Sequence, residues 1–467
     1  MYYHTKWMAV IAICCSIQLP HSAFSQQALS LKDALRIGVA HYGTIRAKQK
    51  YAAASLATVR QTKLDYLPNF NLGAQLDYGT ANGANGPAYA FGSIGIASTG
   101  LPLTSQNWNS AFGSMLLANI NWDFFAFGRS RERIKTAGLK NDLDNSDLQQ
   151  EIFQHQVRIA AAYLNLLAAQ RLTASYRTNL QRADTLRAII RRKAEKELLP
   201  GVDSSQANAE VSNAKSILLK AMTYEDQQNS VLIKMLGTDP QMVQADTLFV
   251  VSLPASLAPA SDTLLTHHPI LEYFNSRIRL SEQQVNYYKT LGLPTFSLGA
   301  ALQGRGTGFG SSYTAANPNY KSSLADGIGP DRANYVIGFG ITWNLTQPLR
   351  IREQVRSQRL ISEGLKEDLE LTRQQLATQL NLSDSTIRNA VADYYETPQQ
   401  VKAADNVYEQ KLVLYNHGLT NLVDVTQALY ALVRAETDRD ISYSNVWQAL
   451  LLKAAAVGDF NLFYNNL

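Results

Sequence analysis

Cysteine and long hydrophobic runs are the clearest absences from this chain of 467 residues. The two cysteines, Cys14 and Cys15, lie near the start, and no later stretch of about 18 apolar residues could form a transmembrane helix. Charge is also sparse, because Asp, Glu, Lys and Arg make up 17% of the residues and the net charge is +5. A net charge this small for the size of the chain argues against nucleic acid as a partner.

Residues 1–25 have the pattern of a secretory signal peptide. Lys6 gives a positive start, residues 7–17 are apolar, and Ala23 and Ser25 are small residues before a cleavage site. Cleavage after Ser25 would remove both cysteines and leave no disulfide, no catalytic thiol and no thiolate metal site. Lipid attachment to a cysteine of this segment is the alternative, which the bulky isoleucine just before the first cysteine disfavours.

Motifs of catalysis and metal binding are also missing. The glycines that alternate over 304–310 are not followed by the Lys-Ser or Lys-Thr of a phosphate-binding loop, and they indicate an outer loop instead. The histidines beyond the signal peptide lack metal-ligand spacing, which favours structural roles for His41, His155, His267, His268 and His417. We therefore predict no enzymatic activity, no cofactor and no metal.

Four stretches alternate apolar and polar residues with the period of a β-strand, and they predict strands over 69–79, 112–124, 295–304 and 334–345. Each is about as long as the roughly 9–11 residues with which a tilted strand crosses a bilayer. Lipid excludes open sheet edges, and the smallest membrane barrels have about 8 strands. If these strands lie in a membrane, several chains must therefore share one barrel. The alternative is a small soluble antiparallel sheet with one polar face.

Helical composition fills most of the remaining chain. Two shorter helices are expected over 31–66 and 262–291, and four long ones over 129–198, 203–236, 349–416 and 422–458. Asp203 or Ser204 is expected to be the N-cap of the second long helix, and Pro398 is expected to kink or break the third. The narrow spacing of a coiled-coil seam occurs at Leu422, Val425, Leu429 and Leu432. Helices of this length must pack against one another to be stable.

The order of these elements occurs twice. Residues 26–240 and 262–467 each contain a helix, a strand, a loop, a strand, a long helix, a turn and a helix, and residues 241–261 connect them. Pro68 and Pro294 stand just before the first strand of each half. The chain is therefore predicted to be a tandem repeat of two similar structural units.

The duplicated order, the Leu-Pro junctions at Pro68 and Pro294, and the turn over 416–429 resemble the TolC-type family of outer-membrane efflux proteins, also called outer membrane factors. The resemblance implies a mixed α/β membrane protein in which three chains share one twelve-stranded β-barrel, with four strands from each. It also implies that the long helices form a coiled-coil tunnel across the periplasm, below the cell outer membrane.

The resemblance implies a passive exit channel of a tripartite efflux pump, which carries small molecules such as drugs from the periplasm to the exterior. The implied partners are two further copies of the chain, outer-membrane lipid, a periplasmic adaptor protein and an inner-membrane transporter. The exit channel of type I protein secretion is an alternative that the sequence does not separate. A soluble extracellular coiled-coil structural protein is the alternative from another class.

The resemblance also implies roles for residues near the helix turns. Asp424 matches an acidic position of the periplasmic constriction, and Gln427 takes the place of a second acid, which leaves one acidic ring. Tyr415 and Asp203 match a tyrosine and an aspartate that link neighbouring helix pairs in the closed state. Thr420 replaces the basic residue expected near them. N-capping of the helices is the alternative role for both aspartates.

The turns and the strand ends supply the remaining candidate residues. The turn residues Pro200, Gly201 and Gly418 are implied to contact the adaptor. Aromatic residues near the strand ends indicate either a belt at the bilayer interfaces or ordinary core packing, and they are Trp108, Trp122, Phe124, Phe125, Phe127 and Trp343.

Overall fold

The computed structural model describes residues 28–83, 102–195, 201–239, 241–246, 250, 252–255 and 267–467. The predicted signal peptide and Pro200 lie outside the described residues. The chain forms two compact units, and each takes segments from both halves of the predicted repeat. We call them the sheet unit, which comprises residues 47–149 and 269–373, and the helix unit, which comprises the described residues of 1–46, 150–268 and 374–467.

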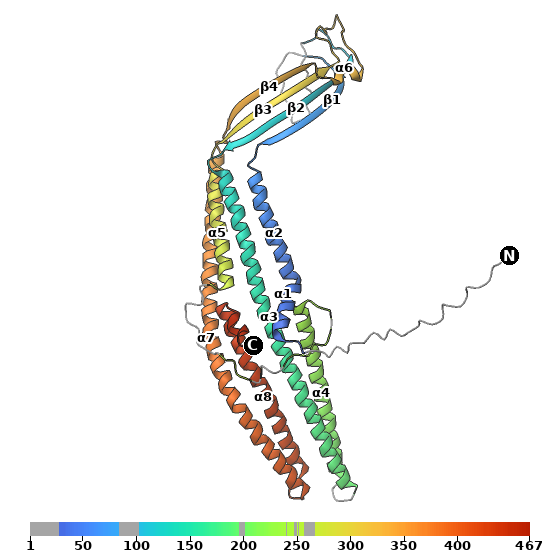
Figure 1. Cartoon of the computed structure of the whole chain (residues 1–467), viewed down its shortest axis with the longest axis vertical. Coiled ribbons are helices and arrows are strands. Elements are labelled where there is room, and N and C mark those ends of the chain that lie inside the picture. Colours follow the sequence, from blue (N-terminus) through green and yellow to red (C-terminus); the bar gives the residue numbers. More distant parts are fainter. Residues whose placement is uncertain are drawn as a thin grey trace, which may run out of the picture. The chain divides into compact units, whose positions relative to one another are not determined.

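The sheet unit contains a four-stranded antiparallel sheet (Figure 1). Its strands pair in sequence order and are β1 (Asn69–Thr80), β2 (Ser110–Phe125), β3 (Thr295–Thr307) and β4 (Arg332–Thr342). All four predicted strands are confirmed, although β4 ends three residues before the expected boundary. The loop expected between β3 and β4 contains a short helix, α6 (Leu324–Ile328). Among the described residues, the outer edges of β1 and β4 pair with no further strand.

The strand register brings the alternating apolar residues of all four strands to one face. Leu72 lies opposite Ala118, Ala118 lies opposite Leu302, and Leu302 lies opposite Tyr335. Directly opposite residues of an antiparallel pair project to the same side of the sheet. The four predicted apolar stripes therefore merge into a single surface, which we call the apolar face. Polar residues such as Asn71 and its partner on β2 occupy the opposite face.

Long helices make up the rest of the two units. The sheet unit contains most of α2 (Gly43–Leu64), all of α5 (Pro269–Thr290), and the first parts of α3 (Arg129–Ala194) and α7 (Gln347–Asn416). The helix unit contains the remainder of α3 and α7 together with α1 (Leu31–His41), α4 (Gly201–Leu236), α8 (Leu422–Val457) and α9 (Asn461–Tyr464). Within the described ranges, no helix is both long enough and apolar enough to cross a membrane.

The helix expected over 31–66 is divided at Tyr42, whose extended backbone ends α1. The prediction of one helix was therefore wrong, because composition alone does not reveal a single extended residue between two helical segments. The predicted N-cap of the second long helix was also wrong. α4 begins at Gly201, so Asp203 and Ser204 lie within its first turn.

α7 continues through Pro398 without a break, so that part of the prediction was wrong. A proline inside a helix removes one backbone hydrogen bond. Ile387 and Ala390 before it, and Tyr408 after it, are buried against neighbouring helices. Packing on both sides of the proline therefore maintains the helix where the local sequence would end it.

The core of the helix unit lies between α3, α4 and α8, where Tyr163, Trp447 and Phe463 are almost completely buried. The predicted seam of α8 is confirmed. Its four residues are each no more than 3% exposed, and they are Leu422, Val425, Leu429 and Leu432. The narrow apolar stripe in the sequence is thus the line along which α8 packs against its neighbours.

Candidate functional site

The turn end of the helix unit is formed by the last turns of α3 and α7 and the first turns of α4 and α8 (Figure 1). There the four helices enclose a hydrophobic cluster of Leu186, Ile190, Ala207, Tyr408, Tyr415, Leu422, Val425, Ala428, Leu429 and Leu432. Every residue predicted to contact helices or to line the constriction lies on these turns. The cluster holds the two helix pairs together and so fixes where those polar residues sit.

Tyr415 and Asp203 meet at the turn end, as the resemblance implied. The Tyr415 hydroxyl donates to a carboxylate oxygen of Asp203 at 3.3 Å, which joins the end of α7 to the start of α4. Tyr415 is 3% exposed, and burial, together with the Asp203 charge and hydrogen bond, raises the pKa of its hydroxyl to about 12. Lys193 lies 5.2 Å from the centre of the Tyr415 ring and donates to the Asn416 carbonyl at 3.1 Å.

Asp424 is held by two donors. The Thr420 hydroxyl donates to its carboxylate at 2.6 Å, and the Lys411 ammonium approaches the same oxygen at 3.2 Å. The hydrogen bond from Thr420, and then that from Lys411, lowers the pKa of Asp424. The N-cap of α8 is Asn421, which accepts from the Asp424 backbone N–H at 2.9 Å, so the capping role considered for Asp424 is wrong.

Two further polar contacts at the turn end were not predicted. Arg182 on α3 makes two hydrogen bonds of 2.8 Å to the Glu436 carboxylate on α8, and this pairing raises the pKa of Arg182. The Tyr430 hydroxyl on α8 donates to Glu210 on α4. Both contacts join the two helix pairs. No sequence signal could identify them, because the partners are far apart in the chain and meet only through helix packing.

The remaining turn-end candidates are exposed. Gln427 lies one turn after Asp424 on α8, and its side chain faces solvent. Gly418 has a φ of +73°, a left-handed conformation that glycine adopts without strain, so it allows the tight reversal between α7 and α8. Gly201 is the first residue of α4. These positions are reachable by a partner that approaches the turns.

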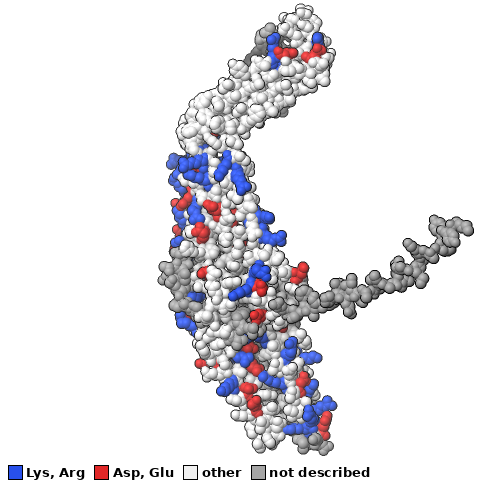
Figure 2. Space-filling view, viewed as in Figure 1, with Lys and Arg blue, Asp and Glu red and all other residues white. Residues whose placement is uncertain are grey.

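The apolar face of the sheet is exposed over its whole width. Leu72, Tyr335 and Ile337 are 75%, 81% and 72% exposed. Figure 2 shows that the described Lys, Arg, Asp and Glu side chains are absent from most of the sheet surface in this view and gather at its loop end. Monomeric soluble proteins rarely expose so continuous an apolar surface. The face therefore requires a covering, which could be lipid or protein.

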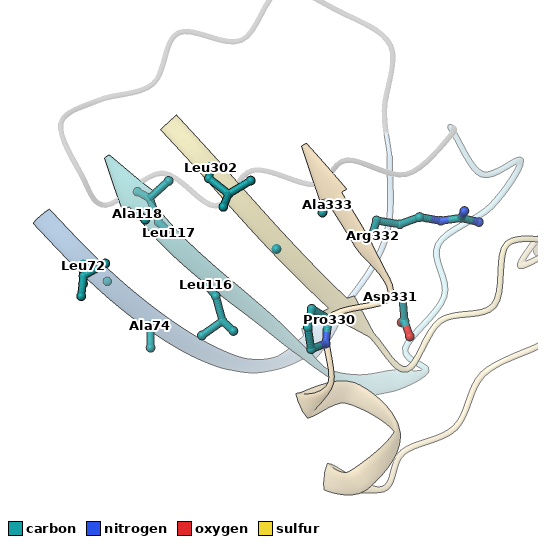
Figure 3. Close-up of a pocket in the computed structure, with 12 residues that line it drawn as sticks. Leu72, Ala74, Leu116, Leu117, Ala118, Leu302, Pro330, Asp331, Arg332 and Ala333 are labelled. Atoms are coloured by element: carbon teal, nitrogen blue, oxygen red, sulfur yellow. The ribbon is translucent and has the colours of Figure 1, made fainter. Parts of the chain in front are cut away.

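A shallow hollow of about 700 Å³ lies on the sheet, between β1, β2 and β3 and the segment that leads into β4 (Figure 3). Its walls are aliphatic, and small residues leave the space between larger ones. The contributing side chains include Leu72 and Ala74 of β1, Leu116 and Ala118 of β2, and Leu302 of β3. Asp331 and Arg332 are the charged residues of its lining, and they do not form a catalytic arrangement. The hollow therefore suits an apolar ligand.

The two candidate tryptophans at the ends of β2 and β4 make equivalent contacts. The Trp122 indole N–H donates to the Tyr66 carbonyl at 2.9 Å, and the Trp343 indole N–H donates to the Gly292 carbonyl at 3.1 Å. Each carbonyl lies two residues before the proline that precedes the first strand of its half. This equivalence supports the predicted repeat. It also shows how each indole fixes the junction between a helix and a strand.

The other candidate aromatics differ in exposure. Phe125 and Phe127 are 47% and 44% exposed, and both contact the Phe296 ring. Phe124 packs against Phe339 on the apolar face, and Trp108 is 80% exposed in the loop before β2. The exposed rings favour the interfacial belt over core packing, although the environment that covers them stays a prediction.

The buried histidines have structural contacts. His155 stacks on the Tyr42 ring at 3.7 Å and lies 2.9 Å from the Met235 carbonyl, and burial lowers its pKa. His268 lies 3.1 Å from the Ala455 carbonyl. Among the described residues, no group of three or more His, Cys, Asp or Glu side chains could hold a metal ion.

Comparison with known proteins supports the resemblance seen in the sequence. Residues 40–238 match the family described as "Outer membrane efflux protein". No curated protein matches the chain. The resemblance to outer-membrane efflux proteins is thus confirmed by the family match, which covers the strands and long helices of the first half.

Several solved structures share the fold. The CmeC outer membrane channel of Campylobacter jejuni aligns with a TM-score of 0.75 and 14% identity, over 92% of this chain and 85% of that one. The outer membrane protein VceC of Vibrio cholerae aligns with a TM-score of 0.71 and 16% identity, over 92% and 96%. The open state of the Neisseria gonorrhoeae MtrE outer membrane channel gives 0.71 and 13%, over 92% and 89%. At these identities the likeness establishes the fold alone.

Proposed function

We propose that this chain, similar to outer-membrane efflux proteins over residues 40–238, is the outer-membrane exit channel of a tripartite efflux pump. Three copies form the channel, and small molecules such as drugs pass through it from the periplasm to the exterior. A periplasmic adaptor and an inner-membrane transporter complete the pump. The channel itself performs no chemistry, and the transporter supplies the energy.

The single observation that carries the proposal is the open, one-sided sheet. Among the described residues, the outer strands β1 and β4 each leave one edge of the sheet unpaired, and one complete face of the sheet is apolar and exposed. Unpaired backbone groups at an edge cannot lie in lipid. Three copies, each pairing its β1 with the β4 of a neighbour, would give a closed barrel of twelve strands with the apolar faces outward. The polar faces would then line the pore.

The turn end is proposed to be the closed periplasmic end of the channel. The Tyr415–Asp203 contact and the Arg182–Glu436 pair hold the two helix pairs of one chain together. Asp424 would contribute one acidic ring around the threefold axis. Its bonds to Thr420 and Lys411 would anchor the carboxylate within each chain and limit its motion toward the axis. The exposed turns, including Gly201 and Gly418, are proposed to contact the adaptor.

Channel formation is tested directly in planar bilayers. The full-length protein, expressed with its first 25 residues, is expected in the outer-membrane fraction, and the detergent-purified product is expected to form discrete cation-preferring conductance steps. Recovery as a water-soluble protein that never conducts would overturn the proposal and favour the extracellular coiled-coil alternative.

The constriction is tested by Asp424→Asn, which keeps the shape and removes the charge. Three carboxylates close to one axis bind divalent cations, and their removal should weaken divalent block. We expect the concentration of Mg²⁺ that halves the conductance to rise at least about tenfold, since a lost charge–charge contact of about 1.4 kcal/mol has that effect. Gln427→Glu is the matched opposite change and should strengthen the block. If the Mg²⁺ block is unchanged in both variants, Asp424 does not line the constriction.

The type I secretion channel stays an alternative because it would use the same duct. The two differ in the transporter that binds. Mild crosslinking in cells followed by identification of the inner-membrane partner separates them. A proton-driven or ATP-driven transporter of small molecules supports the proposal, whereas a dedicated protein exporter would replace efflux by secretion.

A further inference from the structure

The helices of the sheet unit carry a concentration of basic residues at the ends that adjoin the strands (Figure 2). The residues belong to four helices of this one unit, and they are Lys63 of α2, Arg129, Arg131, Arg133 and Lys135 of α3, Lys289 of α5, and Arg350, Arg352, Arg356 and Arg359 of α7. Three acidic residues lie among them, namely Asp65, Glu132 and Glu353. The boundary between the uncharged apolar face and the helices is therefore strongly positive.

A pocket of about 610 Å³ lies within this positive boundary, between the end of α5, the end of β4 and the start of α7. We call it the junction pocket. Four basic side chains and one acidic side chain line it, namely Lys289, Arg352, Arg356, Arg359 and Glu353. Arg352, Arg356 and Arg359 are spaced four and three residues apart, so they lie along one side of α7.

The same pocket has an apolar wall. Leu293, Trp343 and Ile351 contribute to it. The Trp343 indole is fixed by its hydrogen bond to the Gly292 carbonyl and is 53% exposed. Trp343 directly follows the end of β4, where Ile341 belongs to the apolar face, and it therefore lies at the margin of that face. The pocket thus joins an apolar surface to a group of cations.

The cations of the junction pocket lack strong counter-charges. Within the described part of the chain, Lys289, Arg352 and Arg359 form no ion pair. Arg356 approaches Glu353 at 3.9 Å, but both side chains are mostly exposed, and such surface pairs contribute little. Four cations around one weakly paired carboxylate repel one another. An anion bound between them would relieve that repulsion.

We propose that the junction pocket binds the headgroup of an anionic phospholipid. The lipid phosphate lies among Arg352, Arg356, Arg359 and Lys289, because guanidinium groups pair with phosphate oxygens in a two-pronged geometry. The first part of an acyl chain lies against Trp343 and Leu293 and continues onto the apolar face. This inference rests on the proposed function, which puts the apolar face in hydrocarbon.

Both the anionic headgroup and the acyl chain of the ligand are needed to explain the lining of the pocket. A free anion would not use the tryptophan and leucine wall, and an uncharged lipid would leave the cations unpaired. Basic residues next to a membrane attract anionic headgroups, and tryptophan is favoured at the same depth. The junction pocket has both features, because its basic side chains and Trp343 line the same space.

The test compares lipid binding to detergent-purified full-length protein by native mass spectrometry. The probes are phosphatidylglycerol and phosphatidylcholine with identical acyl chains. The pocket variant is Arg352→Gln, Arg356→Gln, Arg359→Gln. The control variant removes the same charge from exposed positions further along α7, namely Arg373→Gln, Arg388→Gln, Lys402→Gln. We expect the natural protein to prefer phosphatidylglycerol, the pocket variant to bind it at least about tenfold more weakly, and the control to behave like the natural protein.

The milder variant Lys289→Gln covers the case in which the triple variant does not fold, and it should weaken phosphatidylglycerol binding by about fivefold. Equal binding of phosphatidylglycerol by natural and pocket-variant protein would overturn the proposal. Loss of the oligomer in the pocket variant would also overturn it, because the pocket would then be a contact between copies of the chain.

Conductance is measured on the same samples. A natural protein that conducts but shows no lipid preference would contradict the lipid site alone. A natural protein that neither inserts nor conducts would contradict the proposed function itself. The two failures are therefore distinguishable.

Discussion

At the scale of single residues, a buried contact at the turn end joins the end of α7 to the start of α4. Tyr415 is enclosed by the hydrophobic cluster, and its hydroxyl has Asp203 as its acceptor. A buried hydroxyl loses more when its partner is removed than an exposed one, because it cannot turn to water. One of the polar contacts between the two helix pairs thus depends on the Tyr415 hydroxyl, which lies among apolar side chains.

In the proposed channel, Tyr415→Phe should weaken the closed arrangement. The lost hydrogen bond is worth about 1 kcal/mol, which corresponds to about a fivefold rise in open probability. Single-channel recording in planar bilayers measures it. Tyr395→Phe is the matched control, because Tyr395 lies on the same helix and is 59% exposed. An equal open probability in the natural protein and in both variants would show that the Tyr415 hydroxyl does not stabilise the closed state.

The ionisation of Tyr415 provides an independent check. Its pKa is raised from 10.0 to about 12, first by burial and then by the Asp203 charge and hydrogen bond. A raised pKa means that the contact stabilises the fold fully below pH 10 and that this contribution is lost as the pH rises through 12. The difference in tyrosinate absorbance between natural protein and Tyr415→Phe should therefore show one tyrosine that ionises near pH 12. Ionisation near 10.0 would contradict the burial of the hydroxyl in solution.

At the scale of elements, α8 depends on its seam rather than on its helix propensity. Leu432 is completely buried within the cluster that joins α8 to α3 and α7. Leu432→Ala should destabilise the helix unit by about 2–5 kcal/mol, because a cavity adds to the lost burial. Leu452→Ala, at a position on the same helix that is 45% exposed, should change stability by less than about 0.5 kcal/mol. Thermal unfolding in detergent followed by helical circular dichroism compares the two. Equal losses would mean that the seam does not carry the packing.

Elements with strong periodicity were predictable from the sequence, and single contacts between distant elements were not. The alternation from Phe70 to Tyr78 predicts β1 to within one residue, because a period of two places all the apolar side chains on one face only in an extended strand. The division of the first helix at Tyr42 left no sign in the composition. Arg182 and Glu436 could not be paired in advance, because their distance depends on the packing of α3 against α8.

The turn-end site was predictable in part. Tyr415 and Asp203 were identified only through the family resemblance, since nothing in their spacing shows that they meet. The same resemblance identified Asp424 but missed Lys411, because the family's expected basic residue is a threonine here and the lysine comes from the preceding helix. Physical reasoning from the sequence thus predicts the elements, whereas the polar contacts need the assembled helices.

At the scale of the whole molecule, the decisive feature is that the sheet is incomplete in one chain. The apolar face has no covering and the edges of β1 and β4 have no partner among the described residues. A single chain in lipid would therefore leave two rows of backbone groups without hydrogen bonds, at several kcal/mol for each group. In the proposed assembly, three copies would remove both edges of every chain at once, so insertion and assembly should be inseparable.

The number of chains in the conducting particle tests this account most directly. The detergent-purified protein is separated by size, its mass is measured by native mass spectrometry, and the same fraction is applied to a planar bilayer. The account predicts that conductance coincides with a particle of three chains and that single chains never conduct. A single chain that is stable without detergent, or that conducts by itself, would contradict it.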